Sequence, residues 1–413
     1  MSLFLGGDKF GSVYLNGDSW AKAYLNGDLI FQKGSPAPTG NFMSIWWNDP
    51  NTSVITEEVI TSVHDIAQLC STTAQNYTIT LSNGHSFSNT DIVDVHFNNA
   101  TTFPTSIPTG FGRLWTSLNI GSQSGNTTLA FPDACTIIGD NLFKDSAFNA
   151  TDVDFNNVLT IGAGFLEGTP YNGTLTGLTG VNTIGDRFLY NCMSFNKPVS
   201  CNPTTIGGYF LAHNNTRATN AMTSAISLGS RLTSIGTDFL AGLPSRHNVF
   251  NNTINFPATL VTIGNRFMAA CNYAGTIDLS ATAITTIGTD FQINGACSGF
   301  AFPTGQSVSV GNGFMHAHQT LINGTLVIPA NVAYIGSDFL YNTANRYVYQ
   351  SIEVNADPSA WASDSTYLTH SYSKHGAADL QYITVTGTYA AAYKTKYPAS
   401  DTSLTYQQCR YYA

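Results

Sequence analysis

The chain has 413 residues, of which only 10% are charged, and its formal net charge is −9 at pH 7. It contains 16 Lys and Arg and no basic run, so we expect no nucleic-acid partner, because such binding requires a cationic surface. No apolar run of about 18 residues occurs, so we expect no membrane-spanning helix. We expect no secretory signal peptide either. Abundant Asn, Thr, Ser and Gly are typical of an extracellular or virion surface rather than of a cytosolic enzyme.

Three units at an interval of ten residues open the chain. They are Phe4-Leu5-Gly6-Gly7-Asp8, Tyr14-Leu15-Asn16-Gly17-Asp18 and Tyr24-Leu25-Asn26-Gly27-Asp28. Asn-Gly and Gly-Gly pairs favour the positive φ angles of hairpin turns, so residues 1–36 are predicted to form a small antiparallel β meander. The Gly and Pro content of residues 33–40 is typical of a linker.

This opening is similar to the short N-terminal repeats of bacteriophage tail and virion-surface proteins, which are built on aromatic-Leu-x-Gly units. The resemblance implies that residues 1–36 anchor the chain to other virion proteins.

A longer repeat begins at residue 138 and is marked by an Ile-Gly pair. Its nine copies start at Ile138, Ile161, Ile184, Ile206, Ile235, Ile263, Ile287, Val310 and Ile335. The intervals of 22 to 29 residues between these positions are in the range of leucine-rich repeats. Between the pairs lie short alternating segments bounded by Asn, Gly and Pro, such as Gly173–Leu178, which predict strands with one buried face.

A Phe follows the Ile by four residues in eight of the nine copies, and the first copy has Leu142 there instead. Residues in register on stacked coils predict a buried spine. The representative spine positions are Ile184, Phe188, Ile235, Phe239, Ile263, Phe267, Ile335 and Phe339. We expect each unit to contain a strand, a turn, a buried Ile-Gly pair, a short helical turn that carries the Phe, and a polar return.

The segment Ile184-Gly185-Asp186-Arg187-Phe188-Leu189-Tyr190-Asn191-Cys192 resembles the repeats of BspA-like leucine-rich repeat proteins, and the resemblance covers roughly residues 101–397. It implies a β-rich solenoid with short helical turns that adheres to another molecule and has no catalytic residues. The segments predicted are 1–36, the meander; 37–100, a lead-in or N-terminal cap; 101–381, the solenoid; and 382–413, a C-terminal cap. The cap includes an expected short helix at 389–398, because the last repeat would otherwise expose its apolar face.

Aspartates recur beside the Ile-Gly pair, at positions 140, 186, 238, 290 and 338. Aligned carboxylates on neighbouring coils are one way in which β-solenoids cleave glycans, whereas an Asp before a short helix is ordinarily its N-cap. The N-cap interpretation is favoured, because the same slot holds Gly164, Arg266 and Gly313 in other copies and only four Glu occur in the chain.

Other chemistry-bearing residues have structural interpretations. His316 and His318 share the spacing of one strand face, but no third metal ligand of matching geometry is apparent, so we expect surface histidines and no metal. Trp46 and Trp47 are expected to be packing residues, and stacking on a sugar is the less favoured alternative. The cysteines are expected to be buried free thiols, with Cys409 as the exception. Cys192 and Cys271 occupy the same slot of coils three apart, and at roughly 4.8 Å per coil they are about 14 Å from each other, beyond disulfide reach.

Two insertions, 214–224 and 244–251, lengthen their repeats, and insertions in solenoids often lie on the binding face. Arg and aromatic side chains are over-represented among binding hot spots. The predicted ligand-binding residues are therefore Arg217, Arg246, His247 and Phe250, with Trp361, Tyr367 and Tyr372 as the second choice.

The leading functional hypothesis is a non-enzymatic bacteriophage virion-associated surface or fibre protein that attaches to a host cell-surface glycan or protein through its solenoid. The alternative is a bacterial cell-surface adhesin of BspA-like type, and the second alternative is a glycan-degrading β-solenoid enzyme. The expected location is accordingly the virion surface or the bacterial cell surface. No cofactor is expected, and homo-oligomerisation is left open.

Overall fold

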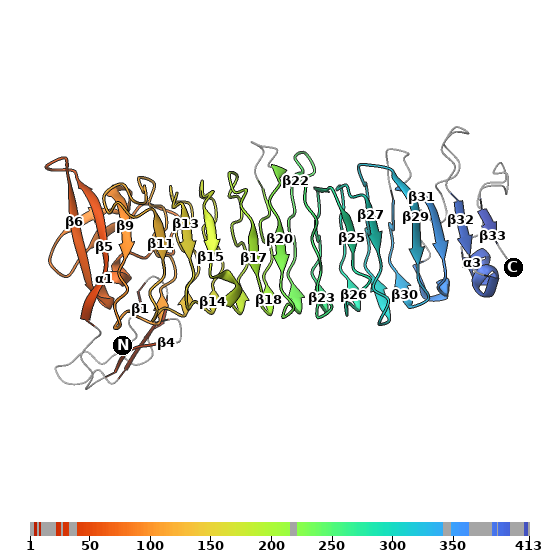
Figure 1. The fold of residues 1–413 in the computed structure, drawn as a ribbon, viewed down its shortest axis with the longest axis horizontal. Helices are drawn as coiled ribbons and strands as arrows, with labels where there is room; N and C mark the ends of the chain where they lie inside the picture. The colour runs from red at the N-terminus through yellow and green to blue at the C-terminus, as the bar shows by residue number, and fades with distance from the viewer. Residues whose placement is uncertain are drawn as a thin grey trace. The chain divides into compact units, whose positions relative to one another are not determined.

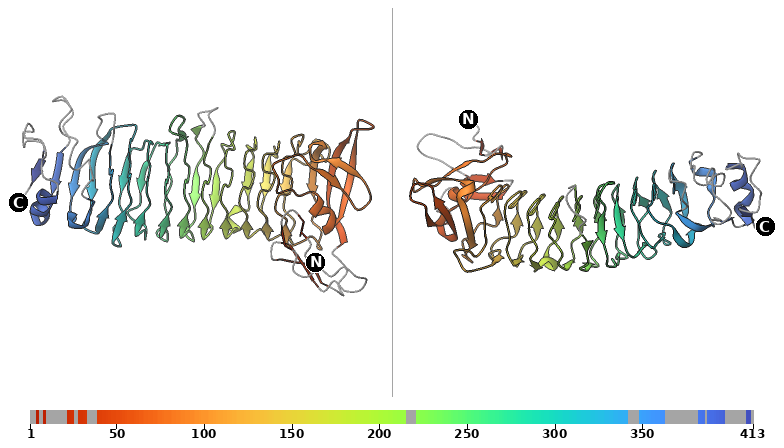
Figure 2. Two further views of the ribbon diagram at one scale, coloured as in Figure 1. Left: turned by 180° about the vertical axis from the view of Figure 1, so that it is seen from behind. Right: turned by 90° about the horizontal axis from the view of Figure 1, so that it is seen from above.

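A computed structural model of the chain describes residues 39–214, 221–341, 348–362, 382–385 and 387–396, with strand residues 4–5, 8–9, 22–25, 28–32 and 409–411. They belong to two compact units, Met1–Pro203 and Thr204–Ala413. Each unit is built of stacked coils whose strands lie side by side (Figures 1 and 2). The predicted fold class, a β-rich solenoid of leucine-rich-repeat type, is confirmed. The four predicted segments divide the chain differently and stay a prediction.

Two antiparallel hairpins are present in the opening repeats. They consist of β1 (Phe4–Leu5) with β2 (Asp8–Lys9), and β3 (Lys22–Leu25) with β4 (Asp28–Gln32). In each hairpin the strand ends pair across two residues of the sequence, as Leu5 with Asp8 and Leu25 with Asp28, which agrees with the expected two-residue turns. The middle repeat and the linker residues 33–38 lie outside the described residues.

A three-stranded antiparallel sheet of order β6-β5-β9 begins the body of the first unit. Its strands are β5 (Thr39–Asp49), β6 (Val54–Ser62) and β9 (Ile92–Phe97), accompanied by α1 (Val63–Gln68), η1 (Asn89–Asp91) and the hairpin β7 (Thr78–Thr80) with β8 (Ser86–Ser88). Phe42, Met43 and Ile45 of β5 are fully buried, so this sheet closes one end of the unit's core.

The coils of the first unit contribute two rows of short parallel strands. One row carries the Ile of each repeat: β10 (Ser106–Ile107), β12 (Ile137–Ile138), β14 (Thr160–Ile161) and β16 (Thr183–Ile184). The other row is β11 (Thr128–Ala130), β13 (Asp152–Asp154) and β15 (Thr174–Thr176). The remaining elements are η2 (Leu178–Gly180) and β17 (Val199–Cys201).

The second unit repeats this arrangement. Its Ile row is β18 (Thr205–Ile206), β21 (Ser234–Ile235), β23 (Thr262–Ile263), β26 (Thr286–Ile287), β28 (Val308–Val310) and β30 (Val332–Ile335). Its other strands are β19 (Ala221–Met222), β20 (Ile226–Leu228), β22 (Asn248–Phe250), β24 (Cys271–Tyr273), β25 (Thr276–Asp278), β27 (Gly299–Ala301), β29 (Ile322–Ile328), β31 (Tyr349–Val354), β32 (Tyr382–Val385) and β33 (Cys409–Tyr411). The helical elements are η3 (Pro358–Ala360) and α3 (Gly387–Lys396), and α3 overlaps the expected closing helix.

The Ile-Gly pair has a steric explanation in the distance between coils. The Gly264 N–H donates to the carbonyl of Ile235 in the preceding coil at 2.9 Å. A Cβ on Gly264 would lie 2.5 Å from the backbone nitrogen of Thr237, and a Cβ on Gly236 would lie 2.4 Å from the nitrogen of Gly208. No side chain fits such an approach, so glycine follows the buried Ile in every repeat.

The segment that carries the Phe is a series of turns, which corrects the expected helical turn. The third residue after the Ile has a φ between 54° and 70° in all nine copies, and the fifth has a φ between 49° and 56°. The N–H of the sixth residue donates to the carbonyl of the third, as Lys144 does to Asn141 at 3.2 Å. The third to sixth residues thus form a four-residue turn, and the fifth residue after the Ile is its third position. A positive φ at that position is the geometry of a type II turn.

These left-handed residues are held by bonds to neighbouring coils. A left-handed conformation costs an L-residue roughly 1–2 kcal/mol. The N–H of Leu166 donates to the carbonyl of Leu142 at 3.0 Å, and that of Leu189 donates to Phe165 at 3.0 Å. The inter-coil bonds therefore offset local strain, which explains why an isolated repeat would not keep this shape.

The Phe side chains stack along each unit. Phe165 and Phe188 lie 5.2 Å apart in the first unit, with an interplanar angle of 9°. The second unit has a stack of its own, made of Phe210, Phe239, Phe267, Phe291, Phe314 and Phe339, with centroid distances of 5.1 to 5.5 Å. All eight representative spine side chains named from the sequence are at most 3% exposed.

Candidate functional site

Two of the aspartates beside the Ile-Gly pair, Asp140 and Asp238, bond to the next coil. Asp140 Oδ1 accepts a hydrogen bond from the N–H of Ala163 in the next coil at 2.7 Å. Asp238, which is 6% exposed, accepts from Nε of Arg266 at 2.8 Å. The helix N-cap interpretation is wrong at these positions, because turns stand where the helix was expected. Their carboxylates have structural partners that a catalytic pair would not share.

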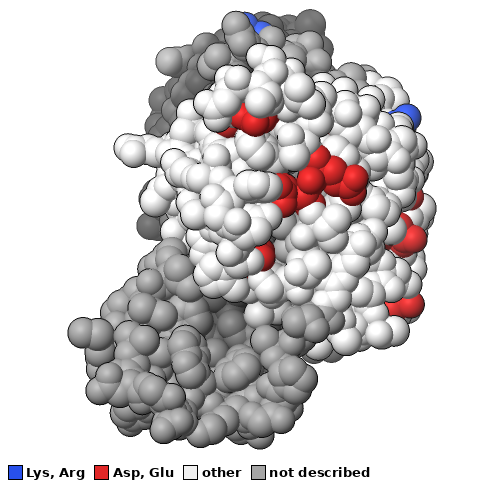
Figure 3. Space-filling view, turned by 90° about the vertical axis from the view of Figure 1, so that its left-hand side faces the viewer, with Lys and Arg blue, Asp and Glu red and all other residues white. Residues whose placement is uncertain are grey.

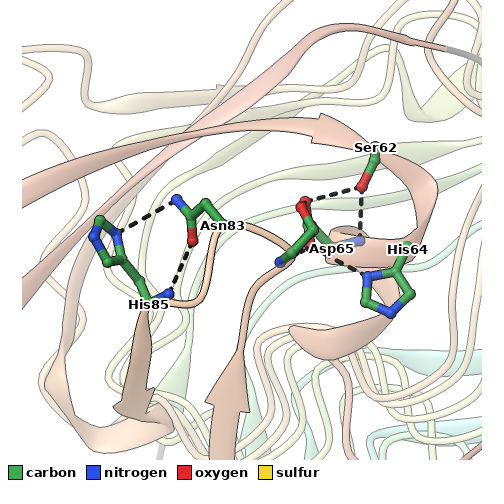
Figure 4. Close-up of polar contacts among 6 residues, drawn as sticks. Ser62, His64, Asp65, Asn83 and His85 are labelled. Carbon is green, nitrogen blue, oxygen red and sulfur yellow. Dashed lines mark hydrogen bonds and ion pairs between the residues drawn. The ribbon is translucent and has the colours of Figure 1, made fainter.

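A polar cluster lies in the sheet region at the start of the first unit (Figure 4). Its buried centre, Asp65 on α1, accepts hydrogen bonds from Ser62 Oγ at 2.9 Å and from both the N–H and the Oγ of Ser82 at 2.8 Å. Burial raises the pKa of Asp65, but the hydrogen bonds from Ser82 and Ser62 outweigh it, so the pKa lies below its usual value. His64 Nδ1 lies 3.3 Å from the same carboxylate.

Glu58 on β6 forms the second half of this cluster. Its carboxylate contacts His85 Nδ1 and accepts a hydrogen bond from Asn83 Nδ2 at 2.9 Å. Glu58 is 7% exposed, whereas the His85 side chain is about half exposed. Together, Glu58 and Asp65 fix the loop between β7 and β8 against β6 and α1.

The geometry of this cluster does not match nucleophilic catalysis. In a serine triad the His stands between the Ser and the carboxylate, so that it can take the hydroxyl proton. Here Ser62 and Ser82 both donate directly to Asp65, and His64 contacts the same carboxylate from another side (Figure 4). The cluster holds the loop between β7 and β8 in place.

Acidic side chains without basic counterparts mark the same region. Residues 39–112 contain Asp49, Glu57, Glu58, Asp65, Asp91 and Asp94 and no Lys or Arg. Asp94 is fully buried and accepts hydrogen bonds from the N–H groups of Val95, Gly121, Gln123 and Ser124. In the view of Figure 3, acidic side chains gather near the centre of the face, and blue appears only near the edge.

The structure corrects two of the predicted ligand-binding residues. Phe250 is fully buried, because the insertion 244–251 ends in strand β22, where the Phe250 ring stacks 5.9 Å from Tyr273. Trp361 is 1% exposed. Neither ring is on the surface, so neither is retained as a ligand contact.

The other predicted ligand-binding residues divide into two groups. Arg246 is exposed and His247 is half-buried. Arg246 exchanges backbone hydrogen bonds with Leu243 at 2.9 and 3.0 Å, so a tight turn presents its side chain. Arg217, Tyr367 and Tyr372 lie outside the described residues.

The expected surface role of His318 is also wrong. The side chain is 2% exposed, with Nδ1 2.7 Å from the Thr320 carbonyl oxygen and Nε2 accepting from the Cys297 N–H at 3.1 Å. Burial lowers the pKa of His318 to about 4.

The described residues contain no group of three His, Cys, Asp or Glu that could hold a metal ion. Trp47 packs on Phe87 with ring centroids 4.5 Å apart.

A row of neutral hydroxyl groups covers the outer side of the Ile strands in the second unit. The residue before the buried Ile or Val is Thr or Ser in five of the six copies of this unit, paired in register as Thr205 with Ser234, Ser234 with Thr262, Thr262 with Thr286, and Thr286 with Ser309. Tyr334 takes this position in the last copy. The preceding residues Thr204, Thr233, Val261 and Thr285 are exposed. We call residues 204–205, 233–234, 261–262, 285–286 and 309 the neutral stripe.

The neutral stripe was not identified as a candidate site from the sequence. Its signal was present, since Thr or Ser precedes the Ile or Val in seven of the nine copies. Thr and Ser are frequent throughout the chain, so this recurrence is not informative until the coil register shows that these hydroxyls form one row.

Comparison with known proteins gives two similarities. A family model described as BspA type leucine rich repeat region matches residues 121–218 and 220–347, in six copies. Among solved structures, the chain is similar to a leucine-rich repeat protein from Bacteroides ovatus ATCC 8483, at 10% identity over 90% of this chain and 98% of that chain, with a TM-score of 0.39. No curated protein matches the chain. Within the described residues, no helix is both long and apolar enough to cross a bilayer.

Proposed function

The chain belongs to the BspA-type leucine-rich repeat family, and from that premise we propose that it is a non-catalytic binding scaffold of the bacterial cell-surface adhesin type. On this proposal it is displayed at a surface and attaches to a glycan or protein of another cell. The neutral stripe of the second unit is its contact face.

The observation that carries the proposal is the division between core and surface positions. The Ile, Gly and Phe of each repeat are used in packing, and Asp140 and Asp238 are used in bonds between coils. What five successive coils of the second unit leave outside is a Thr or Ser hydroxyl at the same position, repeated every ~4.8 Å.

Hydroxyl rows of this kind suit recognition rather than catalysis. A Thr hydroxyl both donates and accepts hydrogen bonds, so it pairs with the hydroxyl and amide groups of glycans and proteins. Thr is β-branched and stiff at χ1, so little side-chain entropy is lost when it is held against a ligand. The stripe contains no charged residue, which favours a neutral ligand surface.

Replacing Thr205, Thr262 and Thr286 together with Val tests this proposal. The change removes three hydroxyls and keeps the β-branched shape. Each hydrogen bond contributes about 0.5–1.5 kcal/mol, so we expect attachment of the full chain to target cells to weaken at least tenfold, or about 1.4 kcal/mol. Thr276→Val and Thr325→Val, at exposed threonines of other strands, are the matched control. Equal attachment by the stripe and control variants would overturn the assignment of the contact face.

A bacteriophage virion-associated attachment protein is the second candidate. The hairpins β1–β2 and β3–β4 support it, since they follow the ten-residue repeat that resembles virion-surface proteins. Fractionation of native cells and particles separates the two candidates. Recovery with the cell envelope supports the adhesin, whereas co-purification with phage particles, lost when residues 1–36 are removed, supports the virion protein.

A further inference from the structure

Strand β6 is an open edge at the start of the first unit. It is the end strand of the sheet β6-β5-β9, and β5 is its one strand partner among the described residues (Figure 1). Pairing with β5 runs without a register shift from Met43 with Ile60 to Asp49 with Val54. A straight edge of this kind presents unpaired backbone N–H and C=O groups to a further strand.

The side chains of β6 make this edge apolar. Val54, Ile55 and Val59 are 58%, 42% and 45% exposed, three of the eight large hydrophobic side chains exposed among the described residues. Ile55, Glu57 and Val59 alternate along one side of the strand, and Glu58 and Ile60 on the other side are buried. The outer side of β6 therefore presents an apolar, an acidic and a second apolar side chain in succession.

Natural edge strands are usually protected against unwanted pairing by charged side chains, above all Lys, by Pro, bulges, inward-pointing charges or a covering segment. Strand β6 carries the exposed Glu57 and the buried Glu58, which disfavour an acidic partner strand, but from Val54 to Ser62 it contains neither Lys nor Pro, and its register from residue 54 to residue 60 is regular. An edge left in this state is suited to strand addition, in which backbone bonds supply affinity and alternate side chains supply specificity.

Charge indicates the kind of strand that fits. Residues 39–112 carry six carboxylates and no Lys or Arg, and Figure 3 shows acidic side chains near the centre of the face. Glu58 is occupied by His85 and Asn83, so Glu57 is the β6 carboxylate left for an added strand. Opposite charges on directly paired residues stabilise a sheet, and like charges destabilise it.

We propose that β6 is a docking edge for an extended segment of a basic partner protein, which adds to the sheet as a fourth strand. The segment carries the pattern apolar-x-Lys/Arg-x-apolar, with its basic residue opposite Glu57 and its apolar residues opposite Ile55 and Val59. This inference goes beyond the adhesin proposal, because it concerns the first unit and needs no contribution from the neutral stripe.

A second copy of the chain is a poorer occupant of the same edge. Antiparallel pairing of β6 with itself through the middle of the strand would bring Glu57 near the partner copy's own acidic pair, at positions 57 and 58. Like charges at paired positions oppose this arrangement. A basic strand removes the repulsion and keeps the apolar contacts.

The test uses the full chain and short labelled peptides. A peptide Thr-Val-Thr-Lys-Thr-Val-Thr is the probe, the same peptide with Glu in place of Lys is the charge control, and a version N-methylated at alternate residues removes backbone donors without changing charge. Fluorescence anisotropy measures binding. We expect the Lys peptide to bind at least ten times more tightly than either control, and hydrogen exchange to slow at residues 54–62.

Variants of the chain locate the site. Val59→Lys should weaken binding of the Lys peptide at least tenfold, whereas Val327→Lys, at a side chain of similar exposure (44%) outside the neutral stripe, should not. Glu57→Lys should reverse the preference toward the Glu peptide, and Asp278→Lys, with the same change in net charge, should not. Equal binding of the N-methylated peptide, the same reversal by Asp278→Lys, or concentration-dependent self-association that Val59→Lys abolishes would each overturn the proposal.

Discussion

Phe239→Ala in the second unit tests whether the stacked rings hold the coils together. Phe239 is fully buried between Phe210, 5.5 Å away at an interplanar angle of 6°, and Phe267, 5.2 Å away at 8°. Truncation of a buried Phe costs about 3–5 kcal/mol through lost transfer free energy and the cavity left behind. Two aromatic pairs are lost as well, each contributing about 0.5–1.5 kcal/mol beyond its buried area. We therefore expect a loss in the upper part of that range, about 4–5 kcal/mol.

Urea denaturation followed by far-ultraviolet circular dichroism measures this loss, with Phe239→Leu as a control that keeps most of the side-chain volume. Hydrogen exchange adds a local readout, since protection should fall first at the coils of Phe210 and Phe267. The Leu variant should cost less than half as much as the Ala variant. A loss below about 1 kcal/mol for Phe239→Ala would refute the reasoning, because a ring buried on both faces has no route to so small a cost.

Three further predictions follow from the same coil geometry. Gly264→Ala should destabilise the chain by about 1–3 kcal/mol, because its Cβ would lie 2.5 Å from the Thr237 nitrogen, whereas Gly305→Ala, with no atom within 4 Å, should be nearly neutral in the same denaturation assay. Burial lowers the pKa of His318 to about 4, so the unfolded chain binds the extra proton between about pH 6.5 and 4. Stability should thus fall as pH drops through this window, and His318→Gln should make the fall of melting temperature shallower. Burial lowers the pKa of His213 to about 4 as well, so His213 contributes in the same direction and part of the fall should persist. Incubation with host polysaccharide should release no oligosaccharides, and release detected by chromatography would favour the glycan-degrading alternative.

The repeat itself was predictable because its cause is periodic. A residue that must be buried in every coil appears at a fixed place in every copy, and the Ile-Gly pair and the Phe meet that condition. Even the departure in the first copy is informative, since Leu142 occupies the Phe slot and is fully buried. The solenoid class follows from these positions without knowledge of any other residue.

The backbone of the Phe segment was not predictable from residue types. The third residue after the Ile is left-handed in every copy, yet the slot holds Asn, Gly, Arg, Tyr or Asp. Local preference would select Gly, Asn or Asp at such a φ, which fits six of the nine copies at the third residue. The fifth residue is also left-handed in every copy, but it is Phe, Leu, Met or Gln, which local preference never selects there. The conformation is imposed by hydrogen bonds to the neighbouring coils, and those bonds have no counterpart within one repeat. The sequence of a single repeat therefore predicts a helical turn, whereas the structure has type II turns.

Phe250 is buried rather than available to a ligand for a related reason. The insertion 244–251 was interpreted as a loop because it lengthens the repeat, but Asn248–Phe250 pairs with β24, so the extra residues extend a row of strands. The sequence singles out Phe250 as an aromatic residue among polar ones, but its burial depends on the pairing of β22 with β24, a strand more than twenty residues away. Binding residues of this chain must therefore be sought at positions whose side chains stay exposed in successive coils, or on a strand that has no further coil stacked on it. The neutral stripe meets the first condition and β6 meets the second, which is why the two proposals concern those residues and can fail independently.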